Sequence, residues 1–275
     1  MANITAADVS KLRQITGAGM MDCKKALVEA EGDFDRAKDL IRERGLAIAN
    51  KRADRDATEG VVLSKTINGG TAGVIIALNC ETDFVAKNQD FVNLANKILD
   101  IAATVLPSDL EGLKASKIDG KTIEELVIER SGITGEKMQI AFYAKISATM
   151  VSSYIHMGNK LATLVGFNQS INPEIGNNVA MQIAAMSPVA VDVKDVPKNV
   201  IDKELEIARE LARNEGKPEN MLDKIAEGRL QKFFKESTLL NQEFVQFGKI
   251  SVKDYLKQQD KDLTVTEFVR FGLSN

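Results

Sequence analysis

Residues 61–88 read VVLSKTINGGTAGVIIALNCETDFVAKN, and this stretch decides the fold at the centre of the chain. Two apolar runs, 61–67 and 72–80, flank the short segment Asn68-Gly69-Gly70. Runs of this length that are rich in valine and isoleucine are typical of β-strands. An Asn-Gly pair between them favours a tight turn, because both residues tolerate a positive φ. The stretch therefore predicts an antiparallel β-hairpin.

The second run leads into a polar stretch that carries one aromatic side chain, Phe84, beside Asp83. The ordinary interpretation is that the ring is buried in the protein's own core. However, Phe84 stands outside the helical spacing that begins at Phe91, and in extended or turn geometry Asp83 and Phe84 point in different directions. An exposed ring next to a carboxylate can enter a partner, where the ring supplies apolar burial and the carboxylate a directed hydrogen bond. These residues alone leave both interpretations open.

The composition indicates an ordinary globular protein with two or three structural units in 275 residues. The net charge is −3, whereas a protein that binds nucleic acid directly is normally basic. No stretch approaches the roughly 18 apolar residues of a membrane span, and the N-terminus lacks the pattern of a secretory signal. We therefore expect a cytoplasmic protein that binds neither nucleic acid nor membranes.

Residue types that commonly carry catalysis or bind metals are scarce. His156 is the single histidine, and Cys23 and Cys80 lie far apart without metal-ligand spacing. No phosphate-binding loop, dinucleotide-binding motif or nucleophile elbow is present. An enzyme built on Cys80 or His156 would lack an accompanying acid–base group. We therefore expect no catalytic residue, no bound metal and no cofactor.

Residues 1–55 predict a compact bundle of three short helices joined at glycines. The third helix is expected to stop at Gly45, and the charged segment 47–60 reads as a linker. Met20 and Met21 follow a flexible glycine joint at the edge of this bundle. The pair either fills the small core or offers an adaptable contact surface to another protein, and the residues alone do not decide between these.

The β pattern recurs further along the chain. Residues 140–155 and 161–167 form a second apolar β segment with a turn between them. Each hairpin is followed by a helical pattern of similar spacing, LANKILDIAA at 94–103 and VAMQIAAMSP at 179–188. We interpret this as a duplicated unit in which a helix covers antiparallel strands.

The predicted fold class is α+β. We expect an N-terminal three-helix bundle over 1–55, an N-terminal core subdomain over 56–139, and a C-terminal core subdomain over 140–196 and 237–275. Residues 197–236 carry dense alternating charge around a narrow apolar seam, which predicts an inserted antiparallel two-helix hairpin. Such a hairpin buries little surface by itself, so it must pack on the core, on another copy or on a partner.

Several motifs resemble the bacterial elongation factor Ts family. ITGAGMMDCKKAL at 15–27 and EGDFDRAKDLIRERG at 31–45 are similar to its N-terminal ubiquitin-associated-like bundle. NCETDFVAKN at 79–88 is similar to the family's TDFVAKN signature, and EGKPENMLDKIAEGRLQKFFKE at 215–236 to its helical hairpin. The segments SYIHMGNKLATLV and FVRFGL also fit, so the resemblance covers essentially the whole chain in the same order.

The resemblance implies a guanine-nucleotide exchange factor for elongation factor Tu, the GTPase that carries aminoacyl-tRNA to the ribosome. In the family, the Asp-Phe pair of the signature enters the partner's G domain and loosens its hold on Mg²⁺ and phosphate, so that GDP leaves. Carried over, this pair is Asp83 and Phe84, flanked by Thr82 and Val85. Asp83 would then act on the Mg²⁺ of the partner, while this chain holds no metal of its own.

Further partner contacts are implied at three places. The methionine pair of the family's first bundle matches Met20 and Met21, and the histidine of its SYxH segment matches His156. An isoleucine between the two β units also contributes in the family, and Ile133 is the nearest candidate. The resemblance allows copies to pair through the helical hairpin, as a homodimer or within a heterotetramer with elongation factor Tu.

One alternative function belongs to a different class. The N-terminal bundle would suit an adaptor that binds a peptide or a ubiquitin-like ligand, but this leaves the 79–88 stretch and the duplicated β units unexplained. Some family members also continue past the final motif into a C-terminal helix that touches another domain of the partner. This chain ends at Asn275, and we expect that contact to be absent.

Overall fold

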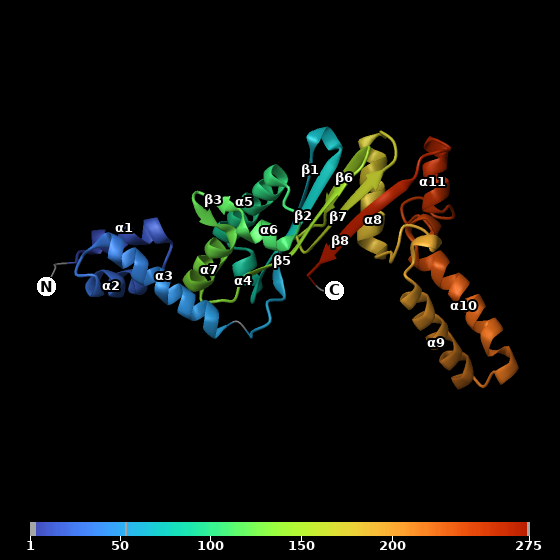
Figure 1. Ribbon diagram of the computed structural model, residues 1–275, viewed down its shortest axis with the longest axis horizontal. Coiled ribbons are helices and arrows are strands. Elements are labelled where there is room, and N and C mark those ends of the chain that lie inside the picture. The colour runs from blue at the N-terminus through green and yellow to red at the C-terminus, as the bar shows by residue number, and fades with distance from the viewer. Residues whose placement is uncertain (1–3, 53, 274–275) are drawn as a thin grey trace.

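The structure is a computed structural model that describes residues 4–52 and 54–273. It confirms the α+β class, and Figure 1 shows an elongated molecule. A helical bundle lies at one end, two three-stranded sheets lie in the middle, and a long helical hairpin projects at the other end. No helix among the described residues combines the length and the apolar character needed to cross a membrane.

The N-terminal bundle consists of α1 (Ala6–Thr16), α2 (Met20–Glu29) and α3 (Phe34–Lys51). Thr5 starts α1 with a capping box, because its side chain accepts from the Asp8 N–H while the Asp8 carboxylate accepts from the Thr5 N–H. The apolar faces of the three helices meet in a small core. Its buried members are Val9, Leu12, Ala18, Cys23, Ala26, Leu27, Ala30, Ala37 and Leu40.

The third helix is longer than the sequence predicted. The expectation that it stops at Gly45 is wrong, since α3 continues to Lys51 and takes in the first part of the expected linker. The reason is that α3 crosses α7 (Ile123–Thr134) at this position. A Cβ atom on Gly132 would lie 2.1 Å from the Cα of Gly45. Gly132 is therefore needed for a close backbone approach, and Gly45, where an added Cβ would lie 3.3 Å from the Gly132 Cα, marks this crossing and not a helix end.

The hairpin that opens the central sheet is confirmed. Strands β1 (Glu59–Ile67) and β2 (Ala72–Cys80) pair antiparallel, and Ile67 stands opposite Ala72. The turn Asn68–Gly70 has positive φ at all three residues, as its composition predicted. Every residue of β2 is buried, because the strand lies in the middle of its sheet with both faces covered.

The expected β segment over 140–155 is in fact two strands in two sheets. β5 (Gln139–Ser147) pairs with the free edge of β2, whereas β6 (Met150–Ile155) pairs with β7 (Leu161–Phe167). The second sheet is completed by β8 (Val265–Gly272) on the other edge of β7. Apolar residues continue across the break between β5 and β6, so the sequence pattern did not reveal it. The subdomain boundary expected between residues 139 and 140 therefore assigns nearly all of β5 to the C-terminal core subdomain, although its partner β2 lies in the N-terminal one.

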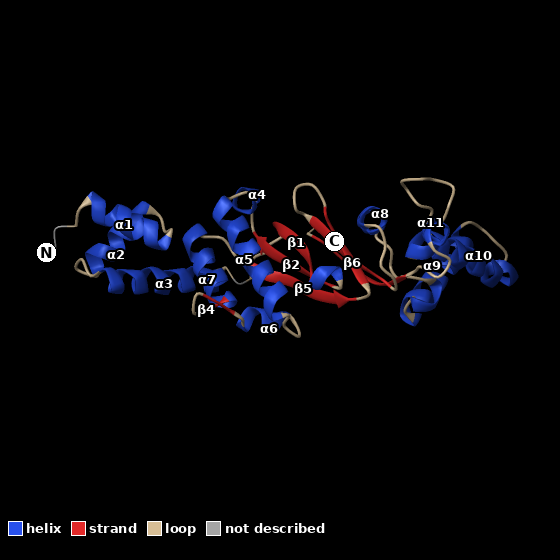
Figure 2. Ribbon diagram, turned by 90° about the horizontal axis from the view of Figure 1, so that it is seen from above, coloured by secondary structure: helices blue, strands red, loops and turns tan. Residues whose placement is uncertain are grey.

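The two sheets pack on each other, and each is covered by a helix on its outer face. Figure 2 shows the strands between α5 (Gln89–Val105) on one side and α8 (Pro173–Met186) on the other. Shorter elements complete the two core units: α4 (Asp83–Ala86), α6 (Leu110–Ala115), β3 (Lys117–Ile118), β4 (Lys121–Thr122) and α11 (Val252–Gln259). The interface between the sheets contains the buried residues Val62, Ile75, Ala77, Ile146, Val151, Ala162 and Leu164.

The helical hairpin is formed by α9 (Lys198–Asn214) and α10 (Leu222–Ser237). Buried apolar residues fill the narrow seam between the two helices. They are Ala208 and Ala212 on α9, and Leu222, Ala226, Leu230 and Phe234 on α10. At the base of the hairpin, Leu230 and Phe234 pack with Ala190 and Val196 of the preceding loop. The hairpin is thus anchored at its base, and its outer part projects away from the sheets (Figure 1).

Candidate functional site

Phe84 lies on a one-turn helix that directly follows the buried strand β2. Thr82 caps this helix, α4, because its Oγ1 accepts a hydrogen bond from the Val85 N–H at 3.5 Å. Ala86 is buried and Val85 is half-buried against the core of the first sheet, whereas Phe84 is 83% exposed. The segment is a single helical turn and not extended, and a helix also separates neighbouring side chains, by about 100°. The ring is therefore presented to solvent by a well-anchored element.

Thr82 is held in place from the opposite side by Glu136. The Thr82 N–H donates to Glu136 Oε2 at 3.1 Å, and its hydroxyl donates to Glu136 Oε1 at 2.6 Å. Both hydrogen-bond donors of Thr82 thus have partners within the chain. We infer that Thr82 shapes the cap of α4, while Phe84 offers the free surface.

Asp83 carries a negative charge on the same turn. Its carboxylate is exposed and forms an ion pair with Lys87, with 2.7 Å between Lys87 Nζ and Asp83 Oδ2. The hydrogen bond from Lys87 lowers the pKa of Asp83 below its ordinary value. Asp83 is therefore ionised at neutral pH. Lys87 is itself exposed, so the pair can open without disturbing the core.

Glu81, one residue before the cap, joins three separate segments. Its carboxylate accepts from Arg52 Nη1 at 3.0 and 3.2 Å, from Arg55 Nη1 at 3.0 Å, and from the Lys137 N–H at 2.6 Å. Desolvation raises the pKa of Glu81, but the Lys137 N–H and the two guanidinium groups outweigh it and lower that pKa to about 2. The sequence analysis missed Glu81, because its partners are 26 to 56 residues away in the chain.

Cys80, at the end of β2, is not a reactive group. The thiol is buried, and its Sγ donates to the Thr82 carbonyl at 3.2 Å. Desolvation, with Glu136 and Glu59 nearby, raises the pKa of Cys80 to about 12. A thiol with so high a pKa is almost fully protonated at neutral pH and is a poor nucleophile.

Met20 and Met21 lie in the first turn of α2 and are 46% and 63% exposed. Cys23, Ala26 and Leu27 fill the core on the other face of the helix. Of the two interpretations left open by the sequence, core filling is therefore wrong for both methionines. Their flexible side chains remain available to another surface.

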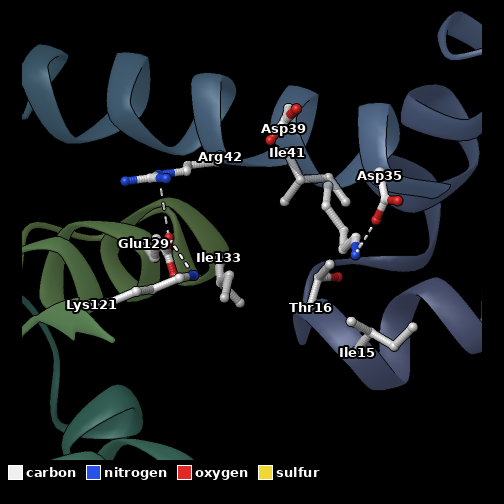
Figure 3. A pocket seen from close by; sticks show the side chains of 10 residues that line it. Ile15, Thr16, Asp35, Asp39, Ile41, Arg42, Lys121, Glu129 and Ile133 are labelled. Atoms are coloured by element: carbon white, nitrogen blue, oxygen red, sulfur yellow. Dashed lines mark hydrogen bonds and ion pairs between the residues drawn. The ribbon is translucent and has the colours of Figure 1, made fainter. Parts of the chain in front are cut away.

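Ile133 lies in the last turn of α7 and is half-buried. It lines a hollow of about 380 Å³ between the bundle and α7, and Figure 3 shows its side chain near Ile15 and Thr16 of α1 and Ile41 of α3. Ion pairs from Arg42 and Lys121 to Glu129 close one side of this hollow. Ile133 thus belongs to the junction between the bundle and the first sheet.

His156 follows the end of β6 and is exposed. Its Nδ1 lies 3.0 Å from the hydroxyl of Tyr154, which orients the ring. The next residue, Met157, is 89% exposed and was not singled out from the sequence. The one sequence signal that could have indicated the exposure of Met157 is its place in the turn between two strands.

The structure brings the His156 turn close to α4. The Asn159 carbonyl accepts from the Val62 N–H of β1 at 2.6 Å, and Lys160 forms an ion pair of 2.8 Å with Glu59 at the start of β1. Lys160 is also near enough to contribute to the lowered pKa of Asp83. The two segments therefore share one end of the sheets, while Met20 and Met21 lie at the start of α2 in the bundle, which borders the α3–α7 crossing.

The described residues hold no group of three or more histidine, cysteine, aspartate or glutamate side chains placed to bind a metal ion. What they present is a set of exposed apolar and charged side chains on anchored elements. Such a surface suits binding to another macromolecule, since the centre of a protein interface needs an aromatic anchor with polar groups around it.

Comparison with known proteins identifies close relatives. A family model described as "Elongation factor TS" matches residues 81–275. Elongation factor Ts of Christiangramia forsetii is 52% identical to the chain over 275 residues, which cover 99% of the chain and all of the relative. Proteins of the same name from Porphyromonas gingivalis and Flavobacterium psychrophilum are 51% and 47% identical, over 98% and 99% of the chain and 98% and 100% of their own lengths.

Proposed function

The chain belongs to the elongation factor Ts family of translation elongation factors, and we propose that it promotes the release of GDP from elongation factor Tu. The observation that carries this proposal is the position of Phe84. The ring is 83% exposed although the helix that bears it is capped, packed and anchored by its neighbours. A large apolar side chain held outside its own fold in this way is suited to a pocket in another protein.

Release of GDP in this proposal is a matter of linked binding equilibria. An exchange factor that binds the nucleotide-free GTPase more tightly than the GDP-bound form lowers the affinity for GDP by the same factor. No residue of this chain has to make or break a covalent bond, so we propose a function without a catalytic residue. The cell compartment that we propose is the cytoplasm, where translation takes place.

Asp83 and Phe84 have different roles in the proposed mechanism. The Phe84 ring supplies the apolar contact that keeps the partner in its open form. The Asp83 carboxylate brings negative charge toward the place where the partner holds Mg²⁺ and phosphate, and this charge disfavours their binding. The ion pair between Asp83 and Lys87 must break first, and because both side chains are exposed, this step costs little free energy.

We also assign partner contacts to Met20 and Met21 on the bundle, to Ile133 at its junction, and to His156 after β6. These residues occupy separate elements, so together they would spread the interface along the molecule. Thr82 and Val85 support the contact through the shape of α4. Support for this assignment comes from the exposure of the methionines and the histidine, and from the resemblance of the surrounding sequence motifs to those of the family.

The test measures GDP release. Elongation factor Tu is loaded with a fluorescent GDP analogue, excess unlabelled GDP is added, and the fluorescence decay is followed at increasing concentrations of this protein. We expect a dose-dependent acceleration with the natural sequence and little with Phe84→Ala. Phe247→Ala is the matched control, because Phe247 is also exposed, at 54%, but precedes α11, which lies on the other side of the two sheets from α4 (Figure 2). No acceleration by the natural sequence would refute the proposed function.

A further inference from the structure

Glu81 connects the N-terminal bundle to the base of α4. Its carboxylate is only 14% exposed and binds both Arg52 and Arg55, which follow the end of α3. On the core side it accepts the N–H of Lys137, and the Lys137 Nζ returns a hydrogen bond of 2.8 Å to the Arg55 carbonyl. We call these four residues the Glu81 clamp.

The clamp fixes one end of a lever. At the Gly45–Gly132 contact α3 crosses α7, and because the two backbones come closest there, this contact is the point about which α3 would tilt. The clamp lies roughly 10 Å beyond this crossing, and the start of α3 at Phe34 lies roughly 16 Å on the other side, at 1.5 Å per residue. A displacement at the clamp is therefore transmitted to the bundle in the opposite direction, and at the start of α3 it is enlarged by about half.

The junction around the crossing is not tightly filled. The hollow of about 380 Å³ beside Ile133 lies between the bundle and α7, and a second, of about 260 Å³, lies between the start of α2 and the crossing. Two ion pairs bridge the bundle and α7 beside the first hollow, from Arg42 to Glu125 and to Glu129, and both use the same exposed guanidinium group, so each is weak in water. Packing on these sides thus leaves the bundle room to tilt.

We propose that Glu81 is a positioning residue, which holds the bundle at the one orientation in which α2 and α4 can bind the same partner molecule together. This inference rests on the proposed function. Two contacts on one rigid body reinforce each other, because the second forms at a high effective concentration once the first is made. When the bundle is no longer held in this orientation, each contact still forms by itself, but the affinity gained by making both contacts together is reduced.

The variant Glu81→Gln keeps the shape of the side chain and removes the charge that the two arginines share. We expect the concentration that gives half-maximal GDP release to rise by roughly tenfold, because linkage of two contacts contributes about 10² or more and only part of it is lost. The maximal release rate should be retained, since Phe84 itself is unchanged. The double variant Arg52→Gln/Arg55→Gln removes the two ion pairs of the clamp and leaves Glu81 in place. It replaces Glu81→Gln in the experiment if that variant does not fold.

A double-mutant cycle separates positioning from a merely structural role. In a Met20→Ala/Met21→Ala background the bundle contact is already weakened, so Glu81→Gln should have little further effect on half-maximal concentration. Loss of structure would instead act in both backgrounds. Full additivity of the two effects would overturn the proposal.

The orientation itself can be measured without the partner. Nitroxide labels are attached at Lys24→Cys of α2 and Asn96→Cys of α5, and pulsed electron paramagnetic resonance measures the distance between bundle and core. Both native cysteines are buried, so the label reacts with the introduced ones. The distance distribution should broaden in Glu81→Gln and stay unchanged in the control Glu215→Gln, which breaks the ion pair with Arg229 in the distant helical hairpin. An unchanged distribution in both clamp variants would overturn the proposal. If the natural sequence does not accelerate GDP release from elongation factor Tu, the proposed function is refuted. The measured label distances still decide whether the clamp orients the bundle.

Discussion

Gly132 of α7 and Gly45 of α3 meet backbone to backbone, so closely that a methyl group on Gly132 would lie 2.1 Å from the Cα of Gly45. This contact joins the N-terminal bundle to the first sheet. It also explains why α3 runs on past Gly45, because a helix needs glycine here only to let another helix approach. The bundle that carries Met20 and Met21 therefore comes closest to the unit that carries Phe84 at these two glycines.

Gly132→Ala should weaken the attachment of the bundle. The added methyl group forces α3 and α7 apart, and overpacking of this kind costs roughly 1–3 kcal/mol. Thermal unfolding measures the effect. Gly228→Ala in α10 is the matched control, because no atom lies within 4 Å of its added methyl and alanine favours a helix over glycine by up to about 1 kcal/mol. Equal melting temperatures for Gly132→Ala and the natural sequence would show that the crossing relaxes freely.

Phe84→Ala should leave the free energy of unfolding nearly unchanged and weaken binding to elongation factor Tu by roughly 2–4 kcal/mol, the range of an interface anchor. Phe91, seven residues later, is fully buried and gives the opposite pattern. Phe91→Ala should cost roughly 3–5 kcal/mol of stability. Urea unfolding and titration calorimetry of both variants test this contrast. A sharp drop in stability for Phe84→Ala would show that the ring belongs to the protein's own core.

Asp83→Asn should separate charge from shape. The side chain keeps nearly the same volume, so binding is retained while the electrostatic influence on the partner's Mg²⁺ and phosphate falls. We expect the acceleration of GDP release to depend less on Mg²⁺ concentration than with the natural sequence. Lys87→Gln is the converse variant, since it frees Asp83 from its ion pair and should leave that dependence intact. Identical Mg²⁺ profiles for Asp83→Asn and the natural sequence would exclude an electrostatic role.

Glu81 should make stability depend on pH in the acid range. Its pKa in the folded protein is about 2, below the ordinary value of 4.5, so the folded state binds this proton less readily than the unfolded chain. The contribution is therefore fully present above about pH 4.5 and is lost as the pH falls toward 2. Urea unfolding of the natural sequence and Glu81→Gln between pH 2 and 7 should show the largest gap in stability near neutral pH. A gap that does not narrow in acid would contradict the ionised clamp.

Removal of the outer part of the helical hairpin should spare GDP release. Residues 206–227 can be replaced by a short Gly-Ser linker, which keeps Leu230 and Phe234 at the hairpin base. The proposed exchange contacts lie on the bundle and around α4, so we expect release to be retained. The exposed apolar residues Ile207 and Leu211 are removed, and any association of copies through the hairpin should be lost. Light scattering tests the loss of association, and the GDP-release assay tests the retained activity. Complete loss of GDP-release activity by a folded variant would place the hairpin in the partner interface.

The sequence by itself determined the local elements and the family. The hairpin at 61–80 could be predicted because apolar strands and an Asn-Gly-Gly turn are local signals, and the helical seam at 197–236 follows from the periodicity of its apolar residues. The Asp83-Phe84 pair could be singled out for the same reason, since an aromatic side chain outside any apolar period stands out in a linear pattern. Its role in partner binding stays a prediction.

Only the tertiary structure decided which segments meet. β5 and β6 share one apolar pattern, and the separate sheets they join depend on distant partners in β2 and β7. Glycine serves both positive φ and close backbone approach, and a sequence does not distinguish these uses until the crossing helix is in place at Gly45. The exposure of Phe84 and the ion pairs of Glu81 likewise depend on what the rest of the chain covers. Local periodicity reports the element a residue belongs to, whereas burial and charge pairing are set by contacts between residues far apart in the chain.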